Sequence, residues 1–248
     1  MNLYQAIFSR HSVRTFTGER LPKNITDKLN LPKTDNYRIV YVDSNLNGSI
    51  GSYGIIRNAP AWLALITDGT PAAELRCAIE AERTVLWMTS RNIASCWVGG
   101  TFNAKEASKK IGIDAGERLV AVIPIGFAAA KKRLIERITS AIAGSTKRKP
   151  FESLFSIPDK LPEIYRKVLE AVRMAPSAVN AQPWRINVDK CSDAVFSSTT
   201  DNSYTMLDMG IAISHFMIAA EELGQKGHIE ISDNPTPGYI ARWFCDRV

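Results

Sequence analysis

The most informative stretch of this sequence is Ala-Pro-Ser-Ala-Val-Asn-Ala-Gln-Pro-Trp-Arg, residues 175–185. It follows an apolar pattern typical of a helix at residues 162–174 and precedes one typical of a strand at 185–189. Two prolines favour a loop here, and the hydroxyl and amide side chains between them suit a planar heterocyclic ligand. The alternative interpretation is an ordinary connection from helix to strand.

A second polar segment, Ser-Arg-His-Ser-Val-Arg-Thr-Phe, occupies residues 9–16 after a predicted helix at 2–10. Two guanidinium groups four residues apart, with an imidazole and a hydroxyl between them, suit a phosphate group. A solvated helix end, in which basic residues complement the helix dipole, is the alternative.

A third segment, Cys-Trp-Val-Gly-Gly at residues 96–100, follows an apolar helix predicted over 73–93. Glycine has no side chain, so the backbone N–H groups of this segment can come close to a ligand.

Together these segments resemble the FMN-dependent nitroreductase family. In that family S-R-R/H-S-x-R/K-x-F follows the first helix and P-S-x-x-N-x-Q-P-W comes later, and residues 9–16 and 176–184 match these patterns almost letter for letter. Residues 120–127 are similar to the family's last core strand, and residues 148–152 to its basic segment before the C-terminal arm. The resemblance implies a nitroreductase-like α+β fold, with antiparallel-rich sheets flanked by helices.

The resemblance also implies an FMN site. The basic segments would hold the phosphate and ribityl chain, the proline-rich loop would contact the ribityl chain or the ring, and residues 97–100 would offer a backbone N–H to flavin N5. The residues implied are Arg10, His11, Ser12, Arg14, Trp97, Val98, Gly99, Gly100, Lys147, Arg148, Lys149, Pro176, Ser177, Asn180 and Gln182.

The order of the motifs departs from the usual family pattern. Arg10 and Pro176 are about 165 positions apart, whereas a usual member has the two motifs much closer together. In the ordinary homodimer each FMN lies between subunits, with the basic motif from one chain and the proline-rich loop from the other. The chain therefore resembles a fused dimer with one remaining site, divided into halves at 1–150 and 151–248.

The predicted elements also recur along the chain. Strands at 37–43 and 61–67, an apolar helix at 73–93 and a strand at 119–127 have counterparts in the second half. Those counterparts are strands at 185–189, 194–199 and 239–246 and a helix at 205–224, and a further strand is predicted at 227–232. Both helices are apolar on more than one face, which predicts that they are buried on more than one face and meet at the centre of the fold.

Composition excludes several classes of protein. The 248 residues include 45% hydrophobic and 23% charged residues with a formal net charge of +6, which are globular proportions. We expect no nucleic-acid partner, because the basic residues are spread along the chain, and no membrane span, because no run of 18 apolar residues occurs. The basic stretch 131–150 is interpreted as a surface connection, and Gly48, Gly51 and Gly54 as a turn.

Motifs for other kinds of chemistry are missing from the sequence. The three histidines have no partner at metal-ligand spacing, so we expect no metal, and no G-x-S-x-G elbow indicates a serine nucleophile. The four cysteines form no C-x-x-C pair, which favours free thiols in the cytoplasm.

A bound flavin would therefore carry the reaction. We expect electrons to pass from NADH or NADPH through FMN to a nitro compound, a quinone or a similar small acceptor. The alternative is an FMN-binding protein without turnover, with a sensor or storage role. Further dimerisation of this pseudo-dimeric chain stays open.

Overall fold

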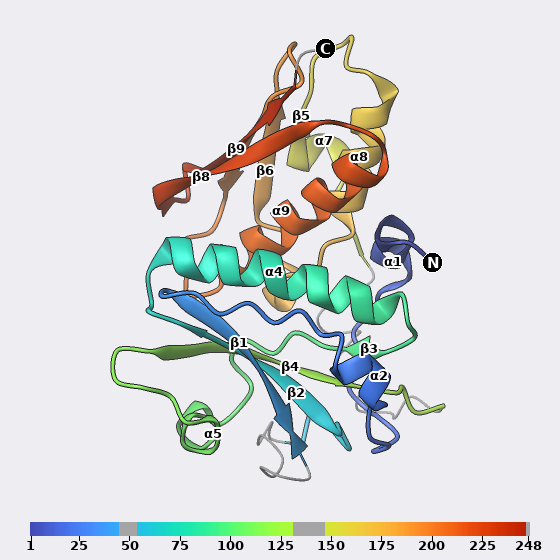
Figure 1. Ribbon diagram of the computed structural model, residues 1–248. Helices are drawn as coiled ribbons and strands as arrows, with labels where there is room; N and C mark the ends of the chain where they lie inside the picture. Colours follow the sequence, from blue (N-terminus) through green and yellow to red (C-terminus); the bar gives the residue numbers. More distant parts are fainter. Residues whose placement is uncertain (45–53, 131–146, 247–248) are drawn as a thin grey trace.

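The computed structural model describes residues 1–44, 54–130 and 147–246, in which two sheets enclose a layer of helices (Figure 1). The expected surface connection at residues 131–146 and the turn positions Gly48 and Gly51 lie outside the described residues.

The first sheet is antiparallel throughout. Its strands are β1 (Tyr37–Asp43), β2 (Ala61–Thr67), β3 (Ala94–Ser95) and β4 (Arg118–Gly126), and their order in space is β1-β2-β4-β3. All seven residues of β2 are buried, because this strand is central and both faces of the sheet are covered.

The second sheet contains β5 (Phe155–Ser156), β6 (Trp184–Val188), β7 (Ala194–Ser198), β8 (Gly227–Thr236) and β9 (Tyr239–Cys245). Its order is β5-β6-β7-β9-β8, and only the β5–β6 pair is parallel. Without β5, the two sheets share one pattern in which the first, second, fourth and third strands of each half are neighbours. The predicted α+β fold with antiparallel-rich sheets is confirmed, and both halves have the same strand order.

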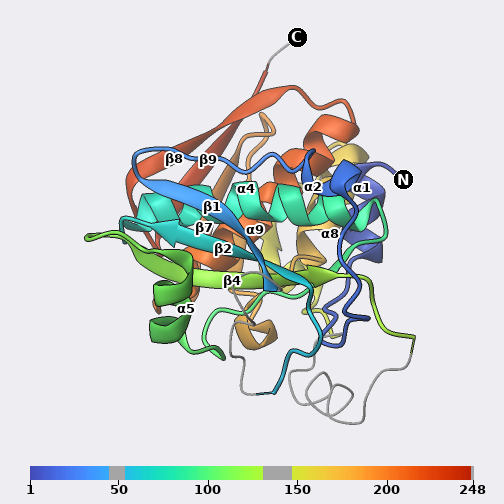
Figure 2. The same cartoon turned by 60° about the horizontal axis from the view of Figure 1, so that its bottom comes forward.

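Two long helices, α4 (Pro71–Thr89) and α9 (Thr205–Glu222), pack against each other between the sheets (Figures 1 and 2). One face of α4 joins the core of the first sheet, and another joins the core shared by α9 and the second sheet. The helices come close at Gly210, where a Cβ atom would lie 2.5 Å from the carbonyl oxygen of Leu75. The predicted central contact between two apolar helices is therefore confirmed.

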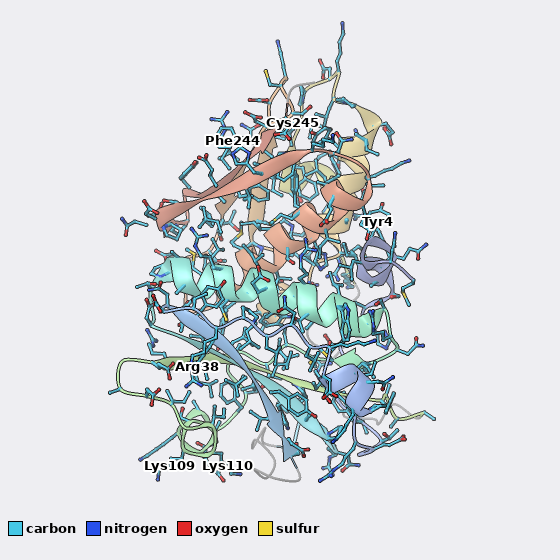
Figure 3. The ribbon with its side chains drawn as sticks, viewed as in Figure 1. Tyr4, Arg38, Lys109, Lys110, Phe244 and Cys245 are labelled. Carbon is cyan, nitrogen blue, oxygen red and sulfur yellow. The ribbon has the colours of Figure 1, made fainter. Side chains whose placement is uncertain are left out.

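The remaining helices lie around this framework. They are α1 (Leu3–Ser9), α2 (Lys23–Thr26), α5 (Ala104–Ile111), α7 (Phe151–Leu154), α8 (Glu163–Arg173) and the 3-10 turn η1 (Ala178–Asn180). Near α5, the guanidinium of Arg38 on β1 donates to both carboxylate oxygens of Glu117, at 2.7 and 2.6 Å. Figure 3 shows Lys109 and Lys110 on α5 at the outer side of the molecule.

The helix expected over 73–93 ends earlier, at Thr89. The chain turns at Ser90, and Asn92 adopts a left-handed backbone conformation with φ of 61°, which asparagine tolerates better than most residues. Among the described residues, no helix combines the length and apolarity needed to cross a bilayer. The division of the chain at residue 150 stays a prediction.

Candidate functional site

A cavity of about 340 Å³ opens between the two halves of the chain. Its walls come mainly from the segment after α1, the segment after β3, the loop after α8 and the first turns of α9. The lining residues are Arg10, Ser12, Arg14, Trp97, Val98, Gly99, Gly100, Thr101, Ala121, Arg148, Pro176, Ser177, Ala178, Val179, Asn180, Tyr204, Leu207, Asp208 and Ile211. Such a concave site with a few polar groups suits a small molecule.

Eleven of the fifteen residues implied by the family resemblance line this cavity. The other four, His11, Lys147, Lys149 and Gln182, do not. Within the described residues, no cluster of histidine, cysteine, aspartate and glutamate side chains could hold a metal ion.

The segment after α1 is extended and lies along β3. Ser12 forms a bridge with Ser95, and the N–H of Val13 donates to the carbonyl oxygen of Ser95 at 2.9 Å. Val13 is buried in the core beneath the first sheet. This backbone pairing brings the basic segment next to residues 97–101, which follow β3.

Alternation along the extended segment decides which side chains reach the cavity. Successive side chains of an extended chain point to opposite sides. Arg10, Ser12 and Arg14 accordingly line the cavity, whereas His11 is exposed and its Nδ1 lies 3.2 Å from the carbonyl oxygen of Ser9.

Two guanidinium groups at the cavity have buried nitrogen atoms without a hydrogen-bond partner among the described residues. They are Nε and Nη1 of Arg10 and Nε of Arg148. The other nitrogens of Arg148 donate to Oδ1 of Asn180 at 2.8 Å and to the carbonyl oxygen of Met174 at 3.0 Å. Burial, followed by the charges of Arg10 and Arg173, lowers the pKa of Arg148 to about 10, so it stays charged at neutral pH.

The loop after α8 has an unusual backbone. Val179, Asn180 and Gln182 have φ angles of 45°, 56° and 46°. The left-handed region is unfavourable for a β-branched residue, at a cost of about 1–3 kcal/mol, and the Val179 side chain is 85% exposed, so packing does not offset it. Strain of this kind gathers at ligand sites.

Hydrogen bonds from the segment before α7 hold this loop in place. The backbone N–H of Lys149 donates to Oε1 of Gln182 at 2.9 Å, and its Nζ donates to the carbonyl oxygen of Ala181 at 2.7 Å. The carbonyl oxygen of Lys147 accepts from the amides of Asn180 and Gln182 at 2.9 and 3.3 Å. Lys147, Lys149 and the buried Gln182 therefore brace the loop from behind the cavity wall.

The backbone of Val98 is already paired. Its N–H donates to the carbonyl oxygen of Val122 at 3.0 Å, and the N–H of Val122 donates back at the same distance. The N–H groups of Gly99 and Gly100 donate to no described residue. The backbone donors that segment 97–100 can offer a ligand therefore include the two glycines but not Val98.

The ring of Tyr204 packs against the same two glycines. A Cβ atom at Gly99 would lie 2.8 Å from Cε1 of Tyr204, and one at Gly100 would collide with the hydroxyl. The glycines therefore make room for an aromatic ring from the second half as well as leaving their N–H groups accessible.

Trp97 forms a hydrogen bond to a buried pair, Glu82 on α4 and His215 on α9, which links the two central helices. Its Nε1 donates to Oε2 of Glu82 at 2.6 Å, and Oε1 of Glu82 lies 3.0 Å from Nε2 of His215. Nδ1 of His215 lies 2.9 Å from the carbonyl oxygen of Ala171 and must donate to it, because a carbonyl only accepts. One hydrogen atom therefore lies between Oε1 of Glu82 and Nε2 of His215, and every polar side-chain atom of the two residues has a partner.

The sequence motifs do not include the residues of α9 that line the cavity. Tyr204, Leu207, Asp208 and Ile211 follow a spacing that places them on one face of the helix start. The one available signal was Asp208, the only carboxylate in the apolar stretch 205–220.

Comparisons with known proteins agree with this architecture. The family model described as "Putative TM nitroreductase" matches residues 2–220. The crystal structure of a "putative nitroreductase" from Thermotoga maritima MSB8 has a TM-score of 0.67 at 21% identity. The aligned region covers 98% of this chain and 93% of the Thermotoga chain. At that identity the likeness shows a shared fold.

Two further structures match about half of the chain. A nitroreductase family protein from Clostridium novyi NT has a TM-score of 0.45 at 20% identity and covers 54% of this chain and 89% of its own. A nitroreductase with bound FMN from Bacteroides fragilis NCTC 9343 has a TM-score of 0.41 at 18% identity and covers 54% of this chain and 92% of its own. No curated protein matches the chain. Because the family model spans residues 2–220, the chain belongs to the family described as "Putative TM nitroreductase".

Proposed function

We propose that this chain binds one FMN in the cavity between its halves and acts as an oxidoreductase. Electrons would come from NADH or NADPH and pass to a nitro compound, a quinone or a similar small acceptor. The observation that carries the proposal is the pair of arginines, Arg10 and Arg148, which line the cavity and carry three buried nitrogen atoms with no hydrogen-bond partner among the described residues.

The charge of the cavity fits a phosphate monoester. Among the described residues, three guanidinium groups and a single carboxyl group line it, and no carboxylate forms an ion pair with Arg10 or Arg148. A buried donor without a partner costs about 1–3 kcal/mol, and more when it is charged. A doubly charged phosphate would remove that cost through charge-assisted hydrogen bonds, with Ser12 as a further donor.

The remaining walls fit the rest of an FMN molecule. The loop 176–180 offers hydroxyl and amide groups for a ribityl chain, and Gly99 and Gly100 offer backbone N–H groups. Val98, Leu207 and Ile211 supply apolar surface for a flat ring. Bound FMN would supply hydride and electron transfer, while the protein binds it, orients it and excludes water.

The proposal of a single site rests on where the groups come from. The arginines belong to residues 1–150, whereas the loop 176–180 and the α9 wall belong to residues 151–248. Each half thus supplies groups that the other half lacks, as the order of the motifs predicts.

Flavin binding and turnover can be tested separately. The purified protein should take up FMN with a shift of the flavin absorbance, and should then oxidise NADH or NADPH when menadione or a nitrofuran is present. FMN binding without oxidation of either donor would favour the storage or sensor alternative. No binding at micromolar FMN would overturn the proposal.

A further inference from the structure

A buried carboxyl group in the cavity has no role in phosphate binding. Asp208 lies in the first turn of α9, is 5% exposed, and lines the cavity beside Leu207 and Ile211. It is the only carboxyl group among the described residues that line the cavity. A carboxyl between two aliphatic side chains is costly to ionise, so its presence there needs a reason.

One oxygen of this carboxyl is held and the other is not. Oδ1 of Asp208 accepts a hydrogen bond from the N–H of Ala178 at 2.9 Å. Oδ2 has no hydrogen bond with any described residue. The backbone of the strained loop therefore orients the carboxyl and leaves one oxygen for a molecule in the cavity.

Burial raises the pKa of Asp208 to about 7, and the N–H of Ala178 lowers it in part. From α4, Glu82 faces α9, but both of its oxygens are occupied. The other charged or titratable groups that line the cavity are Arg10, Arg14, Arg148 and Tyr204.

We propose that Asp208 is the acid that delivers a proton to the oxygen of the bound electron acceptor. This inference rests on the proposed function. For a quinone, the anionic form of reduced FMN would supply a hydride equivalent to one carbonyl oxygen, and Asp208 would supply one proton to the other. The O–H bond of the carboxyl breaks and an O–H bond forms on the acceptor, so the products are the hydroquinone, oxidised FMN and the Asp208 carboxylate. Water then returns the proton to Asp208.

The proposal narrows the acceptor class. It favours acceptors that take up a proton at oxygen when they are reduced, such as quinones and nitro compounds, over acceptors that take up electrons alone. Ferricyanide belongs to the second group, because its reduction adds an electron and no proton.

The test compares the full-length protein with Asp208→Asn. Asparagine has nearly the same shape and keeps an acceptor for the N–H of Ala178, but it cannot ionise or deliver a proton. Ser214→Ala is the matched control, because Ser214 is a buried polar residue of the same helix that does not line the cavity. FMN is reduced anaerobically with dithionite, and its reoxidation by menadione or ferricyanide is followed by stopped-flow absorbance across the neutral pH range.

The rates of Asp208→Asn and the wild type are compared with both proteins saturated with FMN. Reoxidation by menadione should be roughly a hundredfold slower in the variant, which is a typical contribution of a general acid. In the wild type this rate should decrease as the pH rises, and in the variant it should not depend on pH. Reoxidation by ferricyanide should not change, which separates proton delivery from a structural defect. Ser214→Ala should behave as the wild type with both acceptors.

Two other results would contradict the proposal in distinguishable ways. Equal menadione rates and equal pH profiles in FMN-loaded wild type and Asp208→Asn would overturn the role of Asp208 and leave the oxidoreductase function intact. Absence of FMN binding by the wild type would overturn both. Infrared titration of the FMN-free protein adds an independent readout: a protonated-carboxyl band should titrate near neutral pH and be absent from Asp208→Asn.

Discussion

The two halves of this protein share a strand order but differ in what they contribute to the cavity. The first half supplies the arginines and the glycine segment, whereas the second supplies the strained loop and the α9 wall. The same contrast appears in the central helices. Glu82 on α4 has a partner for each oxygen, but Asp208 on α9 has a partner for one. The two central helices therefore hold one buried carboxyl with both oxygens paired and another with one oxygen left for the proton transfer that we propose.

The largest effect is expected at Glu82. Replacement by alanine leaves Nε2 of His215 and the indole N–H of Trp97 without partners in the core, and should lower the free energy of unfolding by about 3–5 kcal/mol in urea denaturation. Glu82→Gln is the control, because an amide can accept from Trp97 and donate to a neutral His215, so its loss should be under about 1 kcal/mol. Equal losses in the two variants would contradict the hydrogen-bond network.

The pH dependence of stability should show that the buried Asp208 carboxyl is protonated in the folded protein below about pH 7. Its pKa is raised in the folded state, so the native protein holds a proton that the unfolded chain loses near pH 4. Stability therefore falls as the pH rises towards about 7, and Asp208→Asn should not share this fall. The wild type should lose about 2–3 kcal/mol relative to the variant between about pH 5 and pH 8. Parallel stability curves would contradict a neutral buried carboxyl.

Removing a guanidinium should weaken FMN binding. Arg10→Ala deletes a charged donor and should make the free energy of FMN binding less favourable by about 1.5–3 kcal/mol in fluorescence titration. Arg166→Ala, which removes a surface arginine on α8 that does not line the cavity, should leave binding unchanged. Unchanged affinity in Arg10→Ala would remove this residue from the proposed phosphate site.

The packing of the central helices depends on a glycine. Gly210→Ala places a methyl group against the backbone of α4 and should destabilise the protein by about 1–3 kcal/mol in thermal or urea unfolding. Gly238→Ala is the control, since a Cβ there meets nothing within 4 Å. A stable Gly210→Ala variant would show that the two helices can separate without cost.

Sequence patterns predicted the framework because apolar periodicity reports burial directly. The seven longer strands and the helices α4 and α9 lie within a few residues of their expected positions, whereas the two-residue strands β3 and β5 were not predicted. Helix α5 was missed because only Ala107 of it is buried, which leaves no apolar stripe to detect.

The sequence motifs predicted only part of the candidate site. The motif residues could be quoted from the sequence, but His11 points away from the cavity because side chains alternate along an extended segment. Tyr204 and Asp208 belong to no motif. Their place in the cavity depends on how α9 packs between the sheets, and no local pattern contains that information.

We propose that two unlike halves build one flavin site, and calorimetric titration of the full chain with FMN can test this. Binding should saturate at one FMN per chain, with affinity reduced in Arg10→Ala. Two FMN molecules per chain, or none, would contradict it.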